Sequence, residues 1–181
     1  STYRGGLLSY AKAKRDMLEW IKQDQNPECR FSTMFDLYAL PEDFPGSQMA
    51  KTIPDPYARV AWLEQKLAED MDHPGFIPYI QLYEFEALLF SDLTKFTLEY
   101  LEHEQAIEQL QHLLQSFQNN PELINDGPNT APSKRILSEI PEYSKAGSGA
   151  IIAEIIGLDQ IRSMCSHFND WVCKLEGLMG K

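Results

Sequence analysis

The sequence predicts an α/β protein, and two observations lead to this prediction. Two short runs, residues 30–36 and 76–83, are rich in the aromatic and β-branched side chains typical of buried strands. Longer segments with apolar side chains at helical spacing lie between and after them. Strands that alternate with helices favour α/β layers. The length suits one domain, which we divide into a strand and helix core, residues 1–93, and a mainly helical extension, residues 94–181.

The core elements each have a local signal. Apolar side chains at helical spacing predict a helix over residues 7–22. The first strand ends at Asp36, and the Pro- and Gly-rich segment 41–54 that follows is longer than most connections, so it is a candidate functional loop. Asp55 followed by Pro56 predicts the start of a helix that runs to about residue 72, with the aspartate as its N-cap.

The extension contains helical signals only. One long helix is predicted over residues 94–118, with Asp92 just before it as an N-cap. A short helix should start at Thr130 or Ser133. Residues 146–149 should open another that closes at Gly157, and a last helix over 159–178 should break near Ser166 and His167.

Composition restricts the class of protein. The net charge of −11 is concentrated in residues 31–132, which hold four basic and seventeen acidic residues. Because neutralised phosphates supply most of the affinity for nucleic acid, a protein that binds by charge alone should be basic. This chain is acidic, so any nucleic-acid contact must depend on the chain ends, bound metal or a partner. We interpret most of the acids in residues 31–132 as a solvated face. No apolar run approaches the roughly 20 residues that span a bilayer.

The cysteines and the first residues suggest where the protein works and how the sequence begins. No secretory signal is visible, and three cysteines form no paired framework, so we expect a cytoplasmic protein. Cys165, His167 and Cys173 lack the fourth ligand and the paired spacing of a zinc site. The chain begins with Ser1 rather than Met, and we expect the natural N-terminus to lie upstream.

Three carboxylates are the candidate metal ligands. Asp36 follows an apolar strand directly, and Glu84 and Glu86 interrupt the otherwise apolar segment 76–90. Ligands gather at the carboxyl ends of strands in open α/β sheets, and Mg²⁺ takes one or two protein carboxylates. The sequence therefore predicts a site for Mg²⁺, or Mn²⁺, at these residues. The structural alternatives stay open: a turn at Asp36, and a helix N-terminus, which favours acids, at Glu84 and Glu86.

Two basic elements are candidate phosphate contacts. Lys134 and Arg135 stand at an expected helix start, where cations oppose the helix dipole and need another reason to be present. Lys145 precedes the glycines of 146–149 and a further helix start. An anionic ligand at these helix starts would supply the reason, although each element alone is as readily structural.

Several blocks together resemble the bacterial domain-of-unknown-function family 4276. They are residues 3–12, 33–46, 78–90, 121–127, 130–135 and 165–171, so the resemblance covers the whole chain in order. It implies a TOPRIM-like fold, a mainly parallel sheet flanked by helices with a helical C-terminal part. Members often accompany an AAA/ABC-type ATPase in anti-phage defence loci. The effector subunit of the PARIS system, a metal-dependent nuclease that attacks tRNA, is similar.

The chain departs from the TOPRIM pattern in two ways. Asp36 matches the first residue of the pattern Asp-x-Asp, but Tyr38 stands at the second position. The first-strand glutamate would precede Ser1. In addition, Tyr83 stands where the family usually has His before the Glu84–Glu86 block.

The resemblance implies a Mg²⁺-dependent nuclease effector that hydrolyses phosphodiester bonds, with RNA such as tRNA favoured and an ATPase as partner. The alternative is a non-catalytic interaction or regulatory subunit of that ATPase, and a third candidate is a nucleotide-processing phosphohydrolase. We expect the present chain alone to bind Mg²⁺ weakly, to cleave poorly and to self-associate through the sheet edge at Asp36.

Overall fold

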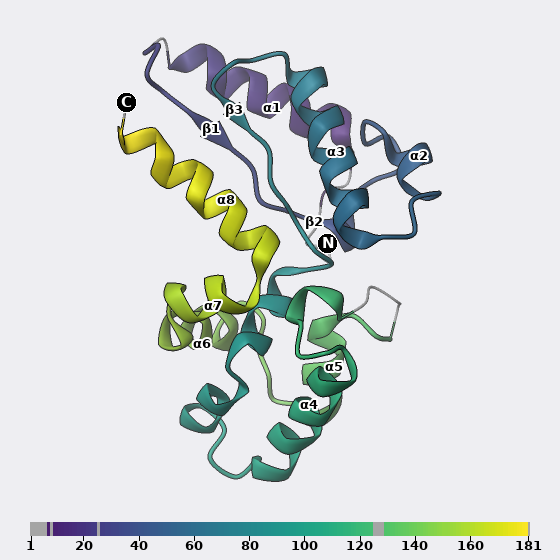
Figure 1. The fold of residues 1–181 in the computed structure, drawn as a ribbon, viewed down its shortest axis with the longest axis vertical. Coiled ribbons are helices and arrows are strands. Elements are labelled where there is room, and N and C mark those ends of the chain that lie inside the picture. Colours follow the sequence, from purple (N-terminus) through teal and green to yellow (C-terminus); the bar gives the residue numbers. More distant parts are fainter. Residues whose placement is uncertain (1–6, 8, 25, 125–128, 181) are drawn as a thin grey trace, which may run out of the picture. The chain divides into compact units, whose positions relative to one another are not determined.

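The computed structural model describes residues 7, 9–24, 26–124 and 129–180, and the chain forms two compact units, Ser1–Gln81 and Leu82–Lys181 (Figure 1). Each unit is described by itself. The α/β class is confirmed, with helices dominant and short strands paired in parallel. In the part of the chain that the structure describes, no helix is both long and apolar enough to cross a membrane. Two parts of the segments that resemble family 4276, residues 3–6 and 125–127, lie outside the described residues.

The first unit holds all the strands that the structure describes and three helices. In chain order its elements are α1 (Tyr10–Gln23), β1 (Phe31–Ser32), β2 (Phe35–Asp36), a 3₁₀ turn (Leu37–Ala39), α2 (Ser47–Ala50), α3 (Pro56–Met71), β3 (Phe76–Ile77) and β4 (Ile80–Gln81).

Each predicted strand is present but is divided into two short pieces. β1 pairs in parallel with β3, and β2 with β4, so that Asp36 stands opposite Gln81. Pro78 lies between β3 and β4 and has no N–H to donate to a ladder. Opposite this gap, the Thr33 hydroxyl accepts from the Tyr79 N–H at 3.3 Å and so substitutes for a backbone acceptor. The division therefore follows from local chemistry, and the two pieces of each run continue one another.

The helix predicted from Asp55 is confirmed as α3. The Asp55 carboxylate accepts from the Ala58 N–H at 2.7 Å, and Pro56 is the first helical residue. The buried face of α3 carries Val60, Leu63 and Leu67 and packs on β3 and β4. This face anchors the strands.

The loop 41–54 has structural contacts of its own. Asp43 accepts from the N–H groups of Tyr10 and Ala11 at 3.0 and 3.3 Å and so caps α1 from a distance. Gly46 has φ +79°, and a Cβ there would lie 2.8 Å from Nε1 of Trp62. The loop therefore fixes the start of α1, which is three residues later than the predicted residue 7.

All regular elements among the described residues of the second unit are helices. In chain order its elements are η2 (Phe85–Ser91), η3 (Leu93–Leu98), α4 (Glu104–Ser116), a 3₁₀ turn (Pro121–Leu123), α5 (Pro132–Glu139), α6 (Ser148–Ile156), α7 (Leu158–Met164), α8 (Ser166–Glu176) and a final 3₁₀ turn (Gly177–Gly180).

The 3₁₀ segment η2 forms the centre of this unit. Its residues Ala87, Leu88, Leu89 and Phe90 are at most 2% exposed. η2 contacts α5, α6 and α7, which follow it much later in the chain. A polar side chain on η2 is therefore surrounded by these helices, and this position explains the burial of Glu86.

The prediction of one long helix over 94–118 was wrong. The chain forms η3, leaves the helical conformation and starts again at α4. The break lets η3 and α4 pack against each other, so that Phe96 and Ile107 are both buried. Burial on two packed segments outweighs the helix propensity of the Glu- and Gln-rich sequence. The predicted cap at Asp92 is confirmed, because its carboxylate accepts from the Thr94 N–H at 3.1 Å.

The other helix boundaries are close to those predicted. α6 closes at Gly157, which has φ +84°. The last helix breaks at Cys165 into α7 and α8, next to the predicted residues Ser166 and His167. The end of α6 at Gly157 and the break in the last helix were both predicted from the local sequence.

The Asp55 cap predicts a measurable loss of stability. Asp55→Ala leaves one N–H of the first turn of α3 without its acceptor, and we expect it to lower the free energy of unfolding by about 1 kcal/mol. Asp55→Asn is the matched control, because asparagine caps helices about as well as aspartate. Urea unfolding followed by circular dichroism measures both. A stability of Asp55→Ala equal to that of wild type and of Asp55→Asn would show that the cap does not stabilise α3.

Candidate functional site

Glu84 and Glu86 lie together at the start of η2, and both are buried. Their side chains are 3% and 5% exposed. Glu84 is the extended residue before η2, with φ −155°, and Glu86 lies in its first turn. Burying a charge without a partner is expensive, so the two carboxylates require compensation from elsewhere in the unit.

The residue before this pair has a strained backbone. Tyr83 has φ +64°, in the left-handed region that bulky side chains rarely adopt. Such a conformation costs on the order of 1–3 kcal/mol and persists only where the surroundings enforce it. The turn at Tyr83 directs the chain from the extended segment into η2 and thereby sets the start of the Glu84–Glu86 pair.

Lys145 supplies the compensating positive charge. Its Nζ lies 2.8 Å from Oε2 of Glu84 and 3.3 Å from Oε2 of Glu86, and it donates a hydrogen bond to each. The lysine side chain itself is half exposed. One ammonium group thus bridges two buried carboxylates from the solvent side.

The N-terminus of α5 holds the other oxygen of Glu84. The backbone N–H of Ser133, a residue 1% exposed, donates to Oε1 of Glu84 in a short hydrogen bond. A helix N-terminus carries partial positive charge and favours an anion. Glu84 is therefore fixed by a backbone donor on one side and by Lys145 on the other. We call Glu84, Glu86, Lys145 and the Ser133 N–H the carboxylate cluster.

The electrostatics of the carboxylate cluster follow from burial and mutual charge. Burial raises the pKa of Glu86 above its usual value, the charge of Glu84 raises it further, and Lys145 opposes both. Burial lowers the pKa of Lys145, but its hydrogen bonds and the charges of the two glutamates outweigh this effect and raise the pKa overall. Lys145 is therefore a firmly charged ammonium group.

Tyr143 places an unsatisfied hydroxyl close to the carboxylate cluster. The residue is 5% exposed, and its Oη has no hydrogen-bond partner among the described residues. Burial raises its pKa, and the charges of Glu86 and Glu84 add to the effect, so the phenol stays protonated. Gly149 makes room for it, because a Cβ there would lie 2.8 Å from this Oη. A buried donor without a protein acceptor needs an oxygen from water or from a ligand.

The carboxylate cluster has donors that suit a hard divalent cation. Two carboxylates meet the preference of Mg²⁺ for one or two protein oxygens, with water and phosphate oxygens in its remaining positions. The unpartnered Tyr143 hydroxyl would gain an acceptor from such an oxygen. Glu84 and Glu86 are the residues that would hold the ion. Lys145 occupies the position between them in the present structure.

The other predicted site residues lie apart from this cluster or in the other unit. Asp36 ends β2 in the first unit, so a metal shared with Glu84 and Glu86 stays a prediction. Lys134 is exposed, and Arg135 donates to the Thr130 carbonyl at 3.3 Å and lines a hollow of about 370 Å³ between α4 and α5. Among the described residues, the hydrogen bond of the Arg135 side chain is therefore to the backbone at Thr130 and not to Glu84 or Glu86.

No larger metal cluster is present in residues 7, 9–24, 26–124 and 129–180, where no group of three or more His, Cys, Asp or Glu could hold an ion. Cys165 is buried with its Sγ 3.4 Å from Oγ of Ser91, and burial raises its thiol pKa to about 12.

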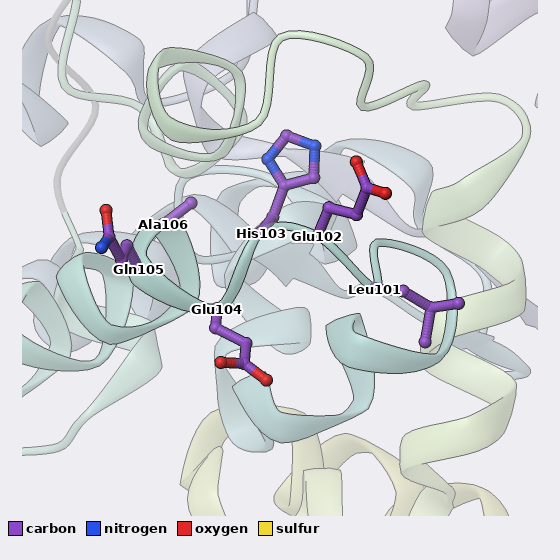
Figure 2. A pocket seen from close by; sticks show the side chains of 6 residues that line it. All are labelled: Leu101, Glu102, His103, Glu104, Gln105 and Ala106. Carbon is purple, nitrogen blue, oxygen red and sulfur yellow. The ribbon is translucent and has the colours of Figure 1, made fainter.

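A second hollow, of about 710 Å³, lies at the start of α4 (Figure 2). Its lining comes from the consecutive residues 101–106. Figure 2 shows that the side chains of His103 and Glu104 point in opposite directions, and the others spread outward. His103 and Glu102 lie on one side of the chain in this view, and His103 is paired with the exposed Glu142 at 3.5 Å, so we assign no site to this hollow.

Sequence reasoning identified Glu84, Glu86 and Lys145 but missed other buried polar groups. Tyr143 and the Ser133 N–H carry no motif, and a tyrosine near a glycine-rich segment gave no signal. Glu122 was missed as well: it is fully buried and accepts from the N–H groups of His167 and Phe168 at 3.1 and 3.0 Å, at the start of α8. Its apolar neighbours Pro121 and Leu123 were the available hint.

The comparison with known families agrees with the resemblance seen in the sequence. The family described as "Domain of unknown function (DUF4276)" matches residues 1–176. The chain belongs to this family. No curated protein and no solved structure matches the chain. All residues of the carboxylate cluster lie within the matched range.

The contacts of Glu84 predict a structural effect of its removal. Glu84→Ala leaves the buried Ser133 N–H and the inner side of Lys145 without an acceptor, and we expect a loss of about 1–3 kcal/mol in the free energy of unfolding. Glu84→Gln should lose less, because its amide oxygen still accepts from Ser133.

The control is Glu99→Ala, which changes an exposed glutamate of the same unit. Denaturant unfolding of all three variants gives the comparison. A loss for Glu84→Ala no larger than that of Glu99→Ala would show that the Ser133 contact has no role in stability.

Proposed function

We propose that this protein is a metal-dependent nuclease, with RNA such as tRNA as the favoured substrate, that acts as an effector of anti-phage defence. The observation that carries the proposal is the buried Glu84–Glu86 pair with the half-exposed Lys145 at its solvent side. Buried acids are uncommon in protein interiors, and groups whose pKa is shifted by burial and by a neighbouring charge, as that of Glu86 is, are enriched at functional sites. The Tyr143 hydroxyl adds a donor beside them.

The proposal assigns a role to each residue of the carboxylate cluster. Glu84 and Glu86 hold Mg²⁺ or Mn²⁺, which polarises a phosphate and activates water. The Ser133 N–H keeps Glu84 oriented. Lys145 has a half-exposed side chain that can reach a phosphate oxygen and offset developing negative charge. Tyr143, a neutral phenol, donates a hydrogen bond to a ligand oxygen.

Substrate and fold details rest on the resemblance to TOPRIM-like effectors such as that of PARIS. That resemblance supports a TOPRIM-like sheet, Asp36 as a further metal ligand, an AAA/ABC-type ATPase as partner and action in the cytoplasm. Lys134 and Arg135 are proposed to contact the nucleic-acid backbone. With a net charge of −11, binding must depend on these local cations and on the metal, because the chain as a whole repels phosphate.

A second candidate function is a non-catalytic subunit that docks on the ATPase. It is favoured by the α1 face, where Trp20 is 70% exposed and, with Met17 and Ile21, lines a hollow of about 270 Å³. Exposed tryptophan is enriched where proteins bind one another. A cleavage assay distinguishes the two functions. The nuclease would cleave nucleic acid with a divalent metal, whereas the docking subunit alone would cleave none.

The first test is single-turnover cleavage of labelled tRNA in the presence of Mg²⁺, with the protein expressed from its complete gene. Glu86→Gln removes a ligand charge with little change in shape, and we expect the rate to fall about 100-fold or more. Asp36→Asn should have a similar effect if Asp36 is a ligand. Glu99→Gln, on the exposed surface, is the matched control and should cleave normally.

Two results would contradict the proposal. Normal cleavage by both Glu84→Gln and Glu86→Gln would make the pair purely structural. Absence of metal-dependent cleavage by the wild-type protein, alone and with its ATPase, would favour the docking subunit. Normal cleavage by Asp36→Asn alone would remove Asp36 from the site and leave the carboxylate cluster intact.

A further inference from the structure

We propose that Lys145 is an internal counter-ion that holds the carboxylate cluster in a metal-free resting state, and that a divalent cation binds by displacing its ammonium group. This inference rests on the proposed function, since it describes how that same site is regulated. It makes Lys145 a positioning and gating residue rather than only a phosphate contact.

The geometry places the ammonium group where the ion would bind. Nζ of Lys145 contacts one oxygen of Glu84 and one oxygen of Glu86. Because Oε1 of Glu84 already accepts from the Ser133 N–H, a divalent cation held by both carboxylates would take Oε2 of Glu84, the oxygen that Lys145 contacts. Two cations at this distance repel each other strongly in a partly desolvated setting. Occupation by the metal and by Lys145 is therefore mutually exclusive.

Among the described side chains of the cluster, Lys145 is the one best placed to move in such an exchange. The carboxylates are 3% and 5% exposed, and Glu84 is fixed further by the Ser133 N–H. The Lys145 side chain is half exposed and has a flexible four-carbon chain. Rotation of this one side chain opens the pair without rearrangement of η2 or α5. The released ammonium group stays close enough to meet a phosphate oxygen.

The carboxylate cluster offers no substitute for Lys145 within the described residues. Neither Glu84 nor Glu86 forms an ion pair there with any other Lys or Arg. Apart from the Ser133 N–H on Glu84, the positive charge that compensates the pair within the described residues is therefore that of Lys145, and a bound cation could take its place. The buried Tyr143 hydroxyl provides independent support, because a water or phosphate oxygen on the ion would give it the partner that it lacks in the described part of the chain.

The test measures Mn²⁺ affinity without substrate, by titration calorimetry on the full-length protein. Lys145→Met removes the competing charge, and we expect Mn²⁺ to bind at least about tenfold more tightly than to wild type, because the metal then relieves two uncompensated buried carboxylates. The rise in melting temperature on adding Mn²⁺ should also be larger for this variant. Lys174→Met, an exposed lysine of α8, is the control and should match wild type.

A second variant keeps the test decisive if Lys145→Met folds only with metal present. Lys145→Arg retains the charge, and its fork can bind both carboxylates at once, so it should bind Mn²⁺ no more tightly than wild type. Equal or weaker Mn²⁺ binding by Lys145→Met overturns the counter-ion proposal, as does tighter binding by Lys145→Arg. Absence of Mn²⁺ binding by both wild type and Lys145→Met overturns it too.

These failures are distinguishable from failure of the proposed function. Affinity is measured on the protein alone, whereas the nuclease is judged by cleavage of tRNA. Equal affinities together with Glu86-dependent cleavage would leave a nuclease whose Lys145 does not gate the metal.

Discussion

The second unit depends on how two buried carboxylates, two residues apart, are compensated. Glu84 and Glu86 begin η2, the segment around which α5, α6 and α7 pack. An uncompensated charge at that position would cost several kcal/mol. The compensation comes from Lys145 and from the first turn of α5, so the charge requirement links segments that are about 50 to 60 residues apart in the chain.

The same requirement recurs at a second helix in this unit. Glu122 lies fully buried against the first turn of α8, much as Glu84 lies against the first turn of α5. Free N–H groups at a helix start are natural anion sites. At both of these helix starts a buried carboxylate of the chain itself is the anion. The difference is that Glu84 has a neighbouring acid and a half-exposed lysine. These two groups are what the proposed metal site requires, whereas Glu122 accepts from backbone N–H groups.

Sequence patterns predicted the local features well. The Asp55 cap and the Gly157 stop follow from residues adjacent to the helix ends, and the acidic pair stood out because it interrupts an apolar run. Features that depend on distant packing were not predictable. The break between η3 and α4 has no Gly or Pro signal, since it arises where two apolar faces meet. The link between Glu84 and Lys145 spans 61 residues, and no spacing rule reaches that far.

The sequence also indicated an anion at the start of α5, and in the structure the carboxylate of Glu84 is such an anion.

The most direct test of this account is a crystal structure of the protein grown with Mn²⁺, with the anomalous signal used to locate the ion. The account predicts an anomalous peak between Glu84 and Glu86, with the Lys145 ammonium group moved out of contact with both. A Lys145 side chain that still bridges the two carboxylates at saturating Mn²⁺, with no peak beside them, would contradict it.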